Sequence, residues 1–372
     1  MIDAFAGGVL IISPEAWDAH SVSKHHYAMT LAARGSQVLF LNPPDDSLDA
    51  IQIHAVSNSP GLRVVSAPRV AAGLRFYPSV LRRWMERRWL LRLEKVAACK
   101  INVVWLFENS RFFDMRFAGD RLKIYHQVDL NQGFHPESAA STADICFCTT
   151  DFIKARLLPF NDSVHKIHHG LAKLVSPDAA ERKVGLLEAA LHKIDFEGVD
   201  VFLIGNLDMI YLDADLLVKL ARHFTNVRFN FVGGFSATGQ LRRMAADLKN
   251  VHWWGKVESA LIPLILDQAD ILLVAYKATE YRDQLASPHK LMEYFASGKI
   301  IVATYTDEYK DKQHLLEMVD NTSDYFSAFE RVISNLAQHN SVERQDERKA
   351  FAQTHTYDKQ LDKIVDLLKK IG

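Results

Sequence analysis

Short apolar runs alternate with amphipathic stretches along most of the chain. The runs are rich in Val, Ile and Leu and too short for helices, so we expect buried strands with amphipathic helices between them. Strands that are apolar on both faces are typical of a parallel sheet covered by helices on both sides. The first expected strands are Gly8–Ser13, Gln37–Leu41, Leu62–Ser66, Asn102–Phe107, Leu122–Val128, Asp144–Thr149 and Val164–Ile167.

The same rhythm restarts after a charged segment at 176–198 that is poor in strand formers. A length of 372 residues also favours two domains. We predict an α/β protein with two doubly wound, Rossmann-like domains at 1–175 and 199–354, a linker at 176–198 and a closing helix at 355–372. The later expected strands are Val199–Ile204, Val227–Val232, Val251–Trp254, Asp270–Ala275 and Ile300–Ala303.

Composition excludes several classes of protein. Hydrophobic residues make up 48% and charged residues 24%, and the net charge of -1 argues against a nucleic-acid partner. The N-terminus lacks the basic segment and long apolar run of a signal peptide. No apolar stretch approaches the roughly 18–20 residues that span a bilayer, so we expect a cytoplasmic protein.

The three cysteines show no metal-binding spacing. Cys146 and Cys148 alternate on one expected strand and should face the same side of the sheet. We interpret them as buried thiols in a reducing compartment. The adjacent His168 and His169 point opposite ways on an extended chain, which argues against a metal site from this pair.

The segment 281–304 carries the most informative chemistry. Ser287 suits an N-cap and Pro288 a first helical residue, so free backbone N–H groups would form an anion site there. His289 and Lys290 place cations in the same first turn, against the preference of the helix dipole. A bound diphosphate would offset that cost.

Glu293 lies one turn after Lys290, where its carboxylate suits two hydrogen bonds to ribose hydroxyls. An ordinary capped helix with a Lys–Glu pair on its surface explains the same residues. The residue pattern alone leaves both interpretations open.

The segment resembles the donor-binding helix of GT-B glycosyltransferases, including family four, in which a helical Glu precedes a small residue, a glycine and a buried strand. Other segments resemble the family in order: Val164–Gly170, Leu203–Asp208 (LIGNLD), Phe231–Gly234 (FVGG), Val251–Val257, Ala269–Tyr276 and His355–Ile371. The resemblance implies two domains facing across a cleft, with a nucleotide sugar bound mainly by the C-terminal half. The donor-binding residues that it implies are Gly205, Asn206, Gly233, Tyr276, Arg282, Ser287, His289, Lys290 and Glu293.

Three positions depart from the family-four pattern. Leu285 stands where a second Glu is usual, and Asn206 and Leu212 stand where an Arg and a Lys clamp the phosphates. We expect Lys290, together with Arg282, to replace that clamp. The retaining mechanism typical of family four is therefore not implied.

The N-terminal half offers a candidate base at YHQVDLNQG. The motif SPHKLMEY is closer to bacterial exopolysaccharide transferases, such as the xanthan-pathway glucuronosyltransferase, and to teichuronic-acid enzymes, and the former resemble this strand too. In them an Asp at its end serves as general base, which implies Asp129 here. An inverting transfer needs one carboxylate to take the proton of the acceptor hydroxyl. His126 is the alternative base; a third interpretation has Asp129 capping a turn and His126 packing in the sheet.

The loop after the first strand is the expected acceptor side. Glu15, Asp18 and His20 could touch a sugar there, or they could simply be solvated. GT-B enzymes as a class need no D-x-D metal motif, so the resemblance implies no essential metal.

The stretch 75–100 is strongly basic. It holds eight Lys and Arg residues against Glu86 and Glu94, and Leu81, Met85, Trp89 and Leu93 recur at a spacing of four. A basic amphipathic helix with Trp is typical of a membrane-surface segment, which would suit a polyprenyl-diphosphate acceptor. A domain helix with a solvated basic face is the alternative.

Together these features predict a glycosyltransferase that builds a bacterial surface glycan, at the inner face of the cell membrane, from a UDP-sugar or, as alternatives, a GDP- or dTDP-sugar. No further cofactor is expected. A nucleotide-sugar 2-epimerase and a non-catalytic GT-B binding subunit are the competing hypotheses.

Overall fold

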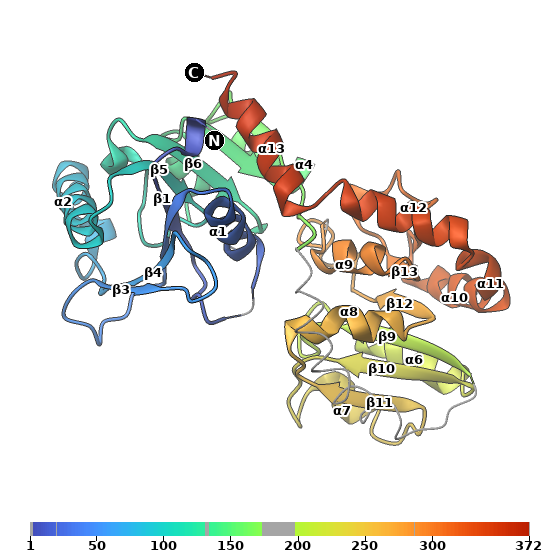
Figure 1. Ribbon diagram of the computed structural model, residues 1–372. Coiled ribbons are helices and arrows are strands. Elements are labelled where there is room, and N and C mark those ends of the chain that lie inside the picture. Colours follow the sequence, from blue (N-terminus) through green and yellow to red (C-terminus); the bar gives the residue numbers. More distant parts are fainter. Residues whose placement is uncertain (1–2, 20, 131–133, 173–197, 286, 372) are drawn as a thin grey trace. The chain divides into compact units, whose positions relative to one another are not determined.

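The computed structural model describes residues 3–19, 21–130, 134–172, 198–285 and 287–371. The chain divides into two compact units (Figure 1). The N-terminal unit comprises 1–170 with 357–372, and the C-terminal unit comprises 171–356. Apart from Gly198, the expected linker at 176–198 lies outside the described residues.

The N-terminal unit contains an eight-stranded sheet in the order β3-β4-β2-β1-β5-β6-β7-β8. All neighbours pair in parallel except β3 with β4. The edge strand β3 was missed because its four residues, QIHA, are mostly exposed and include no apolar run. The strands are β1 Gly8–Ile12, β2 Gln37–Leu41, β3 Gln52–Ala55, β4 Leu62–Ser66, β5 Ile101–Leu106, β6 Leu122–Gln127, β7 Ile145–Cys148 and β8 Val164–Lys166.

Helices cover both faces of this sheet. Val9 and Ile11 of β1 belong to the core under α1 and α13, whereas Leu10 and Ile12 belong to the core under α2. This division follows from the alternation of side chains along a strand. Cys146 and Cys148 are both buried in the α2-side core, on one face as expected. The helices are α1 Ser23–Ala33, α2 Ser79–Ala97, α3 Pro136–Ala140, α4 Asp151–Leu157 and α13 Tyr357–Leu368.

The last helix, α13, packs on α1 within the N-terminal unit (Figure 1). Arg34 pairs with Asp358 at 3.0 Å and with Asp362 at 2.8 Å. The hydroxyl of Tyr357 donates to Ser23 Oγ at 3.2 Å. The expectation that the closing helix returns to the first domain is therefore confirmed.

The expected apolar stripe of the basic helix α2 does not form a single face. A spacing of four residues drifts about 40° around a helix at each step, so Leu81, Met85, Trp89 and Leu93 do not share one side of it. Leu81 is 44% exposed, and Met85 and Trp89 are half-buried. The buried residues of α2 are Arg82, Glu86, Leu90, Leu93 and Ala97.

The C-terminal unit contains a six-stranded, fully parallel sheet in the order β11-β10-β9-β12-β13-β14. The three-residue β14 was not expected. The strands are β9 Val199–Ile204, β10 Val227–Val232, β11 Val251–Gly255, β12 Ile271–Val274, β13 Ile300–Thr304 and β14 Glu317–Val319.

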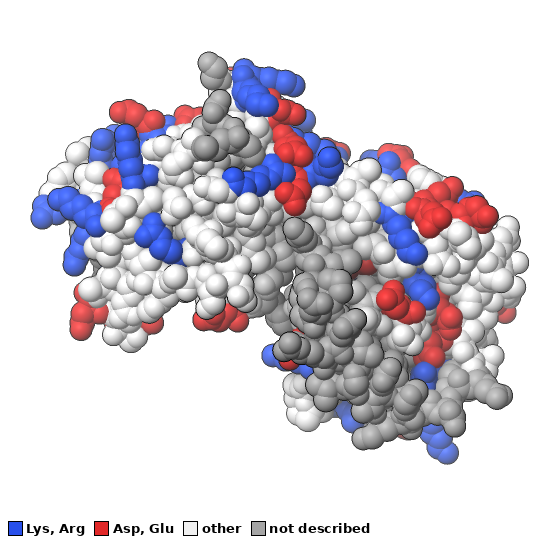
Figure 2. Space-filling model, in the orientation of Figure 1, with Lys and Arg blue, Asp and Glu red and all other residues white. Residues whose placement is uncertain are grey.

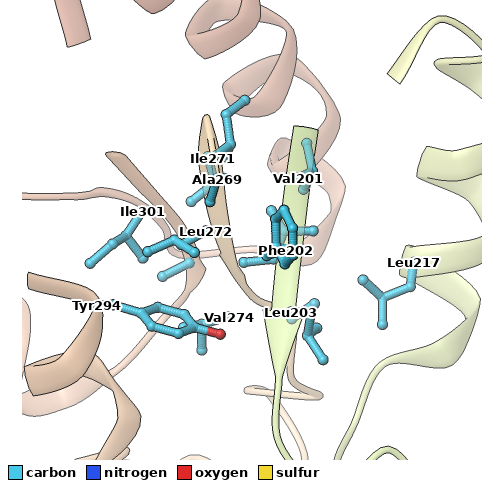
Figure 3. Packing of buried hydrophobic residues seen from close by; sticks show 14 of the residues in the cluster. Val201, Phe202, Leu203, Leu217, Ala269, Ile271, Leu272, Val274, Tyr294 and Ile301 are labelled. Atoms are coloured by element: carbon cyan, nitrogen blue, oxygen red, sulfur yellow. The ribbon is translucent and has the colours of Figure 1, made fainter. Parts of the chain in front are cut away.

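Helices pack around this second sheet. Figure 3 shows Phe202 of β9 and Leu272 of β12 in a core shared with Tyr294 of α9 and Leu217 of α6. No helix in the described ranges is both long and apolar enough to cross a bilayer. The helices are α6 Ala214–His223, α7 Gln240–Met244, α8 Ile262–Asp267, α9 Lys290–Ser297, α10 Tyr325–Ser334, α11 Leu336–His339 and α12 Val342–Gln353.

Candidate functional site

Strand order reverses at one point in the C-terminal sheet. After β9 the chain adds β10 and β11 on one side, and then returns to place β12 on the other side of β9. The loops that follow β9 and β12 therefore diverge and leave a crevice, where ligands of such sheets bind. Gly205 and Asn206 follow β9, and Tyr276 follows β12, so three of the predicted donor-binding residues lie at this edge.

Lys290, the first residue of α9, reaches the same edge. Its Nζ donates to the carbonyl of Ile204 at 2.7 Å and lies 5.0 Å from the ring centroid of Tyr276. The side chain is buried, and this burial lowers its pKa, against the opposing effects of Tyr294 and Glu293. One acceptor is recorded for this ammonium among the described residues, so it retains N–H donors for an anion.

Two glycines, which carry no side chains, follow β9 and β10 near this ammonium. Gly205 and Gly233 adopt φ values of 150° and 137°, which residues with side chains rarely adopt. A side chain on Gly205 would come within 3.1 Å of Lys290 Nζ, and one on Gly233 would overlap the carbonyl of Gly205. The two glycines therefore allow the loop after β10 to pack against the Gly205 carbonyl and leave the ammonium of Lys290 uncrowded.

The start of α9 differs from our prediction. The helix begins at Lys290 with His289 at its N-cap, so Ser287 is not the cap and Pro288 is not the first helical residue. Residues 288–291 form a turn in which the Leu291 amide donates to the Pro288 carbonyl at 3.2 Å, and this turn delays the helix. No side chain caps the helix, and His289 is exposed at its start, but the amides of Leu291 and Met292 already donate to the carbonyls of Pro288 and His289, at 3.2 and 3.3 Å.

Glu293 and Tyr294 lie one turn further along α9. The amide of Ile204 donates to the Tyr294 hydroxyl at 2.9 Å, which fixes α9 on the end of β9. Glu293 is half-buried, and desolvation raises its pKa while Lys290 lowers it. Its carboxylate is thus held near the ammonium with part of its surface accessible.

Arg282 and Asn206 have local partners. The Arg282 guanidinium lies over the ring of Tyr305, 4.2 Å from its centroid, and 3.9 Å from Asp307, at the end of β13. Asn206 Oδ1 accepts from the Asp208 amide at 3.1 Å and shapes the loop after β9. No contact between Arg282 and Lys290 is recorded among the described residues.

The N-terminal sheet has a reversal of its own, between β1 and β5. Glu15 follows β1 and Glu108 follows β5, so both carboxylates lie where the loops diverge. Lys24, in the first turn of α1, is 2% exposed and forms an ion pair with Glu15. Sequence reasoning missed Lys24 and Glu108, although Glu108 directly follows an apolar run.

Asp129 belongs to the same electrostatic neighbourhood. It lies two residues beyond β6 and its side chain is solvent-exposed. Partial desolvation still raises its pKa, the Lys24 charge opposes this shift, and Glu15 reinforces it. Burial likewise raises the pKa of Glu108, whose oxygens accept from the amide and the hydroxyl of Ser110.

His126, the alternative base, lies inside the sheet. It is 1% exposed, and its ring stacks with Trp105 and Phe107 at centroid distances of 6.0 and 5.0 Å. Burial lowers its pKa to about 3, and neither ring nitrogen has a hydrogen-bond partner among the described residues. A neutral imidazole in this position cannot reach a substrate, which corrects its candidacy as a base.

The remaining acceptor-side candidates are less informative. Asp18 is exposed in a turn, and His20 lies outside the described residues. Within the described ranges no group of three or more His, Cys, Asp or Glu residues is arranged to hold a metal ion.

Comparison with known proteins identifies the class. Residues 199–335 match the family model "Glycosyl transferases group 1". The C-terminal unit thus matches the group 1 glycosyltransferases over most of its length, and the recognition of a GT-B glycosyltransferase from the sequence is confirmed. The chain is also 25% identical over 201 residues to the putative teichuronic acid biosynthesis glycosyltransferase TuaH of Bacillus subtilis (strain 168). That match covers 51% of this chain and 49% of TuaH, so it spans about half the length of this relative.

Solved structures share the fold over almost the whole chain. Sucrose-phosphate synthase from Thermosynechococcus elongatus aligns with a TM-score of 0.72 and 14% identity, covering 98% of this chain and 99% of that chain. Anabaena HepE, solved in complex with UDP and glucose, aligns with a TM-score of 0.64 and 11% identity, covering 97% and 99%. The fold is thus the GT-B fold expected from the sequence, with two parallel Rossmann-like sheets.

Proposed function

We propose that the protein transfers a sugar from a nucleotide-sugar donor to a glycan or lipid-linked acceptor during synthesis of a bacterial surface polysaccharide. The observation that carries this proposal is the buried Lys290 at the strand-order reversal of a group 1 glycosyltransferase unit. The similarity to TuaH supports the polysaccharide assignment. A working site in the cytoplasm, at the inner face of the membrane, follows from that role.

The donor diphosphate is proposed to bind at the start of α9. Lys290 would neutralise part of its charge, and the absence of a side chain at Gly205 leaves that ammonium uncrowded. Glu293 would accept hydrogen bonds from the ribose hydroxyls. We favour a UDP-sugar because the similar HepE was solved with UDP and glucose; GDP- and dTDP-sugars are the alternatives.

The N-terminal unit is proposed to supply the base. Asp129 would take the proton of the acceptor hydroxyl as that oxygen bonds to the anomeric carbon and the nucleoside diphosphate leaves. Its accessible side chain and raised pKa suit a base working near neutral pH. Lys24 would limit that rise in pKa and keep the carboxylate ionised.

Removing either charge of α9 should weaken nucleotide binding. We expect Lys290→Ala to raise the Kd for UDP at least about tenfold, because a charge-assisted hydrogen bond contributes roughly 1.5–3 kcal/mol. We expect Glu293→Ala to weaken binding through loss of the ribose contacts. Isothermal titration calorimetry measures both, and Lys299→Ala, which removes a cation just beyond the other end of α9, should bind like the wild type. Wild-type affinity in both α9 variants would move the donor site elsewhere.

Neutralising Asp129 should separate catalysis from binding. We expect Asp129→Asn to lower the rate of transfer by about 10²–10⁴, the usual contribution of a general base, while UDP affinity stays unchanged. Asp120→Asn, at another exposed carboxylate, should retain full activity. Unchanged transfer in Asp129→Asn would remove Asp129 from the mechanism.

The same assay on the wild type separates the competing functions. Turnover of the donor without an acceptor would indicate an epimerase, and absence of turnover would indicate a binding subunit.

The outer side of α2 is proposed to contact an anionic membrane. Phe76 is 77% exposed, Trp84 is 56% exposed, and Val80 and Leu81 lie exposed between them. Figure 2 shows basic side chains gathered over α2, on the left of the view. No ion pair is recorded among the described residues for its exposed arginines Arg83, Arg87, Arg88 and Arg92. Exposed apolar and cationic groups together suit lipid headgroups.

Vesicle co-sedimentation tests this surface. The wild type should sediment with vesicles that contain phosphatidylglycerol, less so at high salt, and not with phosphatidylcholine alone. Trp84→Glu should abolish most of the binding, whereas Ile210→Glu, at an exposed apolar residue of the C-terminal unit, should bind normally. Equal sedimentation of the two variants would contradict the assignment of α2.

A further inference from the structure

A cavity of about 670 Å³ opens in the N-terminal unit. Its walls are the first half of α2, with the short helix Leu74–Phe76 before it, and the loops that follow β2, β4, β5 and β6. It therefore lies at the carboxyl edge of the sheet, where the loop carrying Asp129 also begins. A volume of this size is typical of sites that enclose a small organic ligand. The function proposed above gives this cavity no role.

The cavity wall carries an excess of positive charge. Four arginines line it, and Glu86 is the acidic residue among the lining side chains. Two of the four are balanced, Arg69 by Asp46 and Arg82 by Asp114 at 2.8 Å.

The other two guanidinium groups, those of Arg75 and Arg111, have no ion pair recorded among the described residues. Arg111 donates to the carbonyls of Asn42 and Pro68, at 2.8 and 3.3 Å, and burial lowers its pKa to about 10. Arg75 is exposed at the rim, with its guanidinium 4.8 Å from the ring centroid of Phe76. An anion entering the cavity would meet both positive charges.

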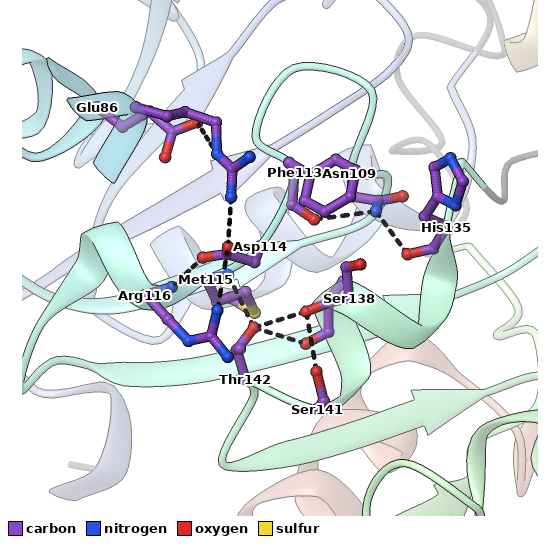
Figure 4. Close-up of polar contacts among 12 residues, drawn as sticks. Glu86, Asn109, Phe113, Asp114, Met115, Arg116, His135, Ser138, Ser141 and Thr142 are labelled. Atoms are coloured by element: carbon purple, nitrogen blue, oxygen red, sulfur yellow. Dashed lines mark hydrogen bonds and ion pairs between the residues drawn. The ribbon is translucent and has the colours of Figure 1, made fainter. Parts of the chain in front are cut away.

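Buried polar atoms in the same wall lack partners. Glu86 is 1% exposed, and neither carboxyl oxygen accepts a hydrogen bond; its nearest cation, Arg82, is 3.9 Å away (Figure 4). Asn109 is 2% exposed, and its amide donates to the carbonyls of Phe113 and His135 at 3.2 and 3.0 Å. Its Oδ1 has no hydrogen bond among the described residues. Buried acceptors without donors are rare, and ligand hydroxyls would supply them.

Aromatic rings complete the lining. Phe134 is 57% exposed in the cavity lining, and Phe113 lies half-buried in the wall, under the guanidinium of Arg82. Flat aromatic faces can cover the C–H face of a sugar ring while polar groups bind its hydroxyls. The lining thus combines cations, hydroxyl-binding acceptors and aromatic surface.

We propose that this cavity is the acceptor subsite and that it binds a sugar phosphate. The phosphate meets Arg75 and Arg111, the sugar hydroxyls donate to Glu86 and Asn109, and the ring packs on Phe134. This inference rests on the proposed function, because it names the chemical class of its acceptor. A lipid-linked sugar diphosphate and a free sugar phosphate present the same chemistry, and the experiment distinguishes them.

Calorimetry on the full chain with UDP bound tests the proposal. Glucose 1-phosphate should bind at least about tenfold more tightly than glucose or inorganic phosphate alone, because two sets of contacts are made together. Arg75→Ala should weaken glucose 1-phosphate about tenfold by removing one charge-assisted contact. Glu86→Leu should weaken glucose 1-phosphate by removing the hydroxyl acceptor. Arg156→Ala, on exposed α4 away from the lining, should bind like the wild type.

The outcomes separate this proposal from the donor assignment. Unchanged glucose 1-phosphate affinity in Arg75→Ala and Glu86→Leu overturns the subsite, even where UDP binds normally. Failure of the wild type to bind UDP overturns the donor assignment on its own. A glucose linked by diphosphate to a short prenyl chain is the second probe; tighter binding than glucose 1-phosphate identifies a lipid-linked acceptor, and equal binding identifies a free sugar phosphate. Thermal melting of Arg75→Ala should match the wild type, since the side chain is exposed and unpaired among the described residues.

Discussion

The buried ammonium of Lys290 ties the first turn of α9 to the last residue of β9. Withdrawing a charge from water is costly, and here one carbonyl, the face of Tyr276 and the nearby carboxylate of Glu293 offset part of that cost. The ammonium retains N–H donors beyond its bond to the Ile204 carbonyl, and these donors favour binding of an anion. Gly205 carries no side chain that would crowd this fixed charge, and no side chain caps the start of α9 beside it.

In both units charged side chains lie where the strand order of the sheet reverses, but the sign of the charge differs between the two units. Where strand order reverses, two neighbouring loops diverge, and charged side chains collect in the space that they leave. The C-terminal unit places a cation there, which suits a diphosphate. The N-terminal unit places the carboxylates of Glu15 and Glu108 there, with Asp129 after the neighbouring β6, around the ammonium of Lys24, which suits proton transfer from a hydroxyl.

The sequence predicted what hydrophobic burial dictates. Strands buried on both faces leave unbroken apolar runs, so nearly all the strands were expected, whereas the exposed edge strand β3 and the short β14 contain no such run. The helix α9 was predicted, but its first residue was not. A turn at Pro288 precedes the helix, so Ser287 does not cap it. The surroundings of the charged residues depend on contacts between distant parts of the chain. Sequence periodicity therefore could not show that Lys290 is buried, or that Lys24 lies among Glu15, Glu108 and Asp129.

A crystal structure of the protein with UDP tests the central claim most directly. Our account predicts diphosphate oxygens within hydrogen-bonding distance of Lys290 Nζ, with the ribose hydroxyls on Glu293. A nucleotide bound elsewhere, with Lys290 still donating only to the carbonyl of Ile204, would contradict it.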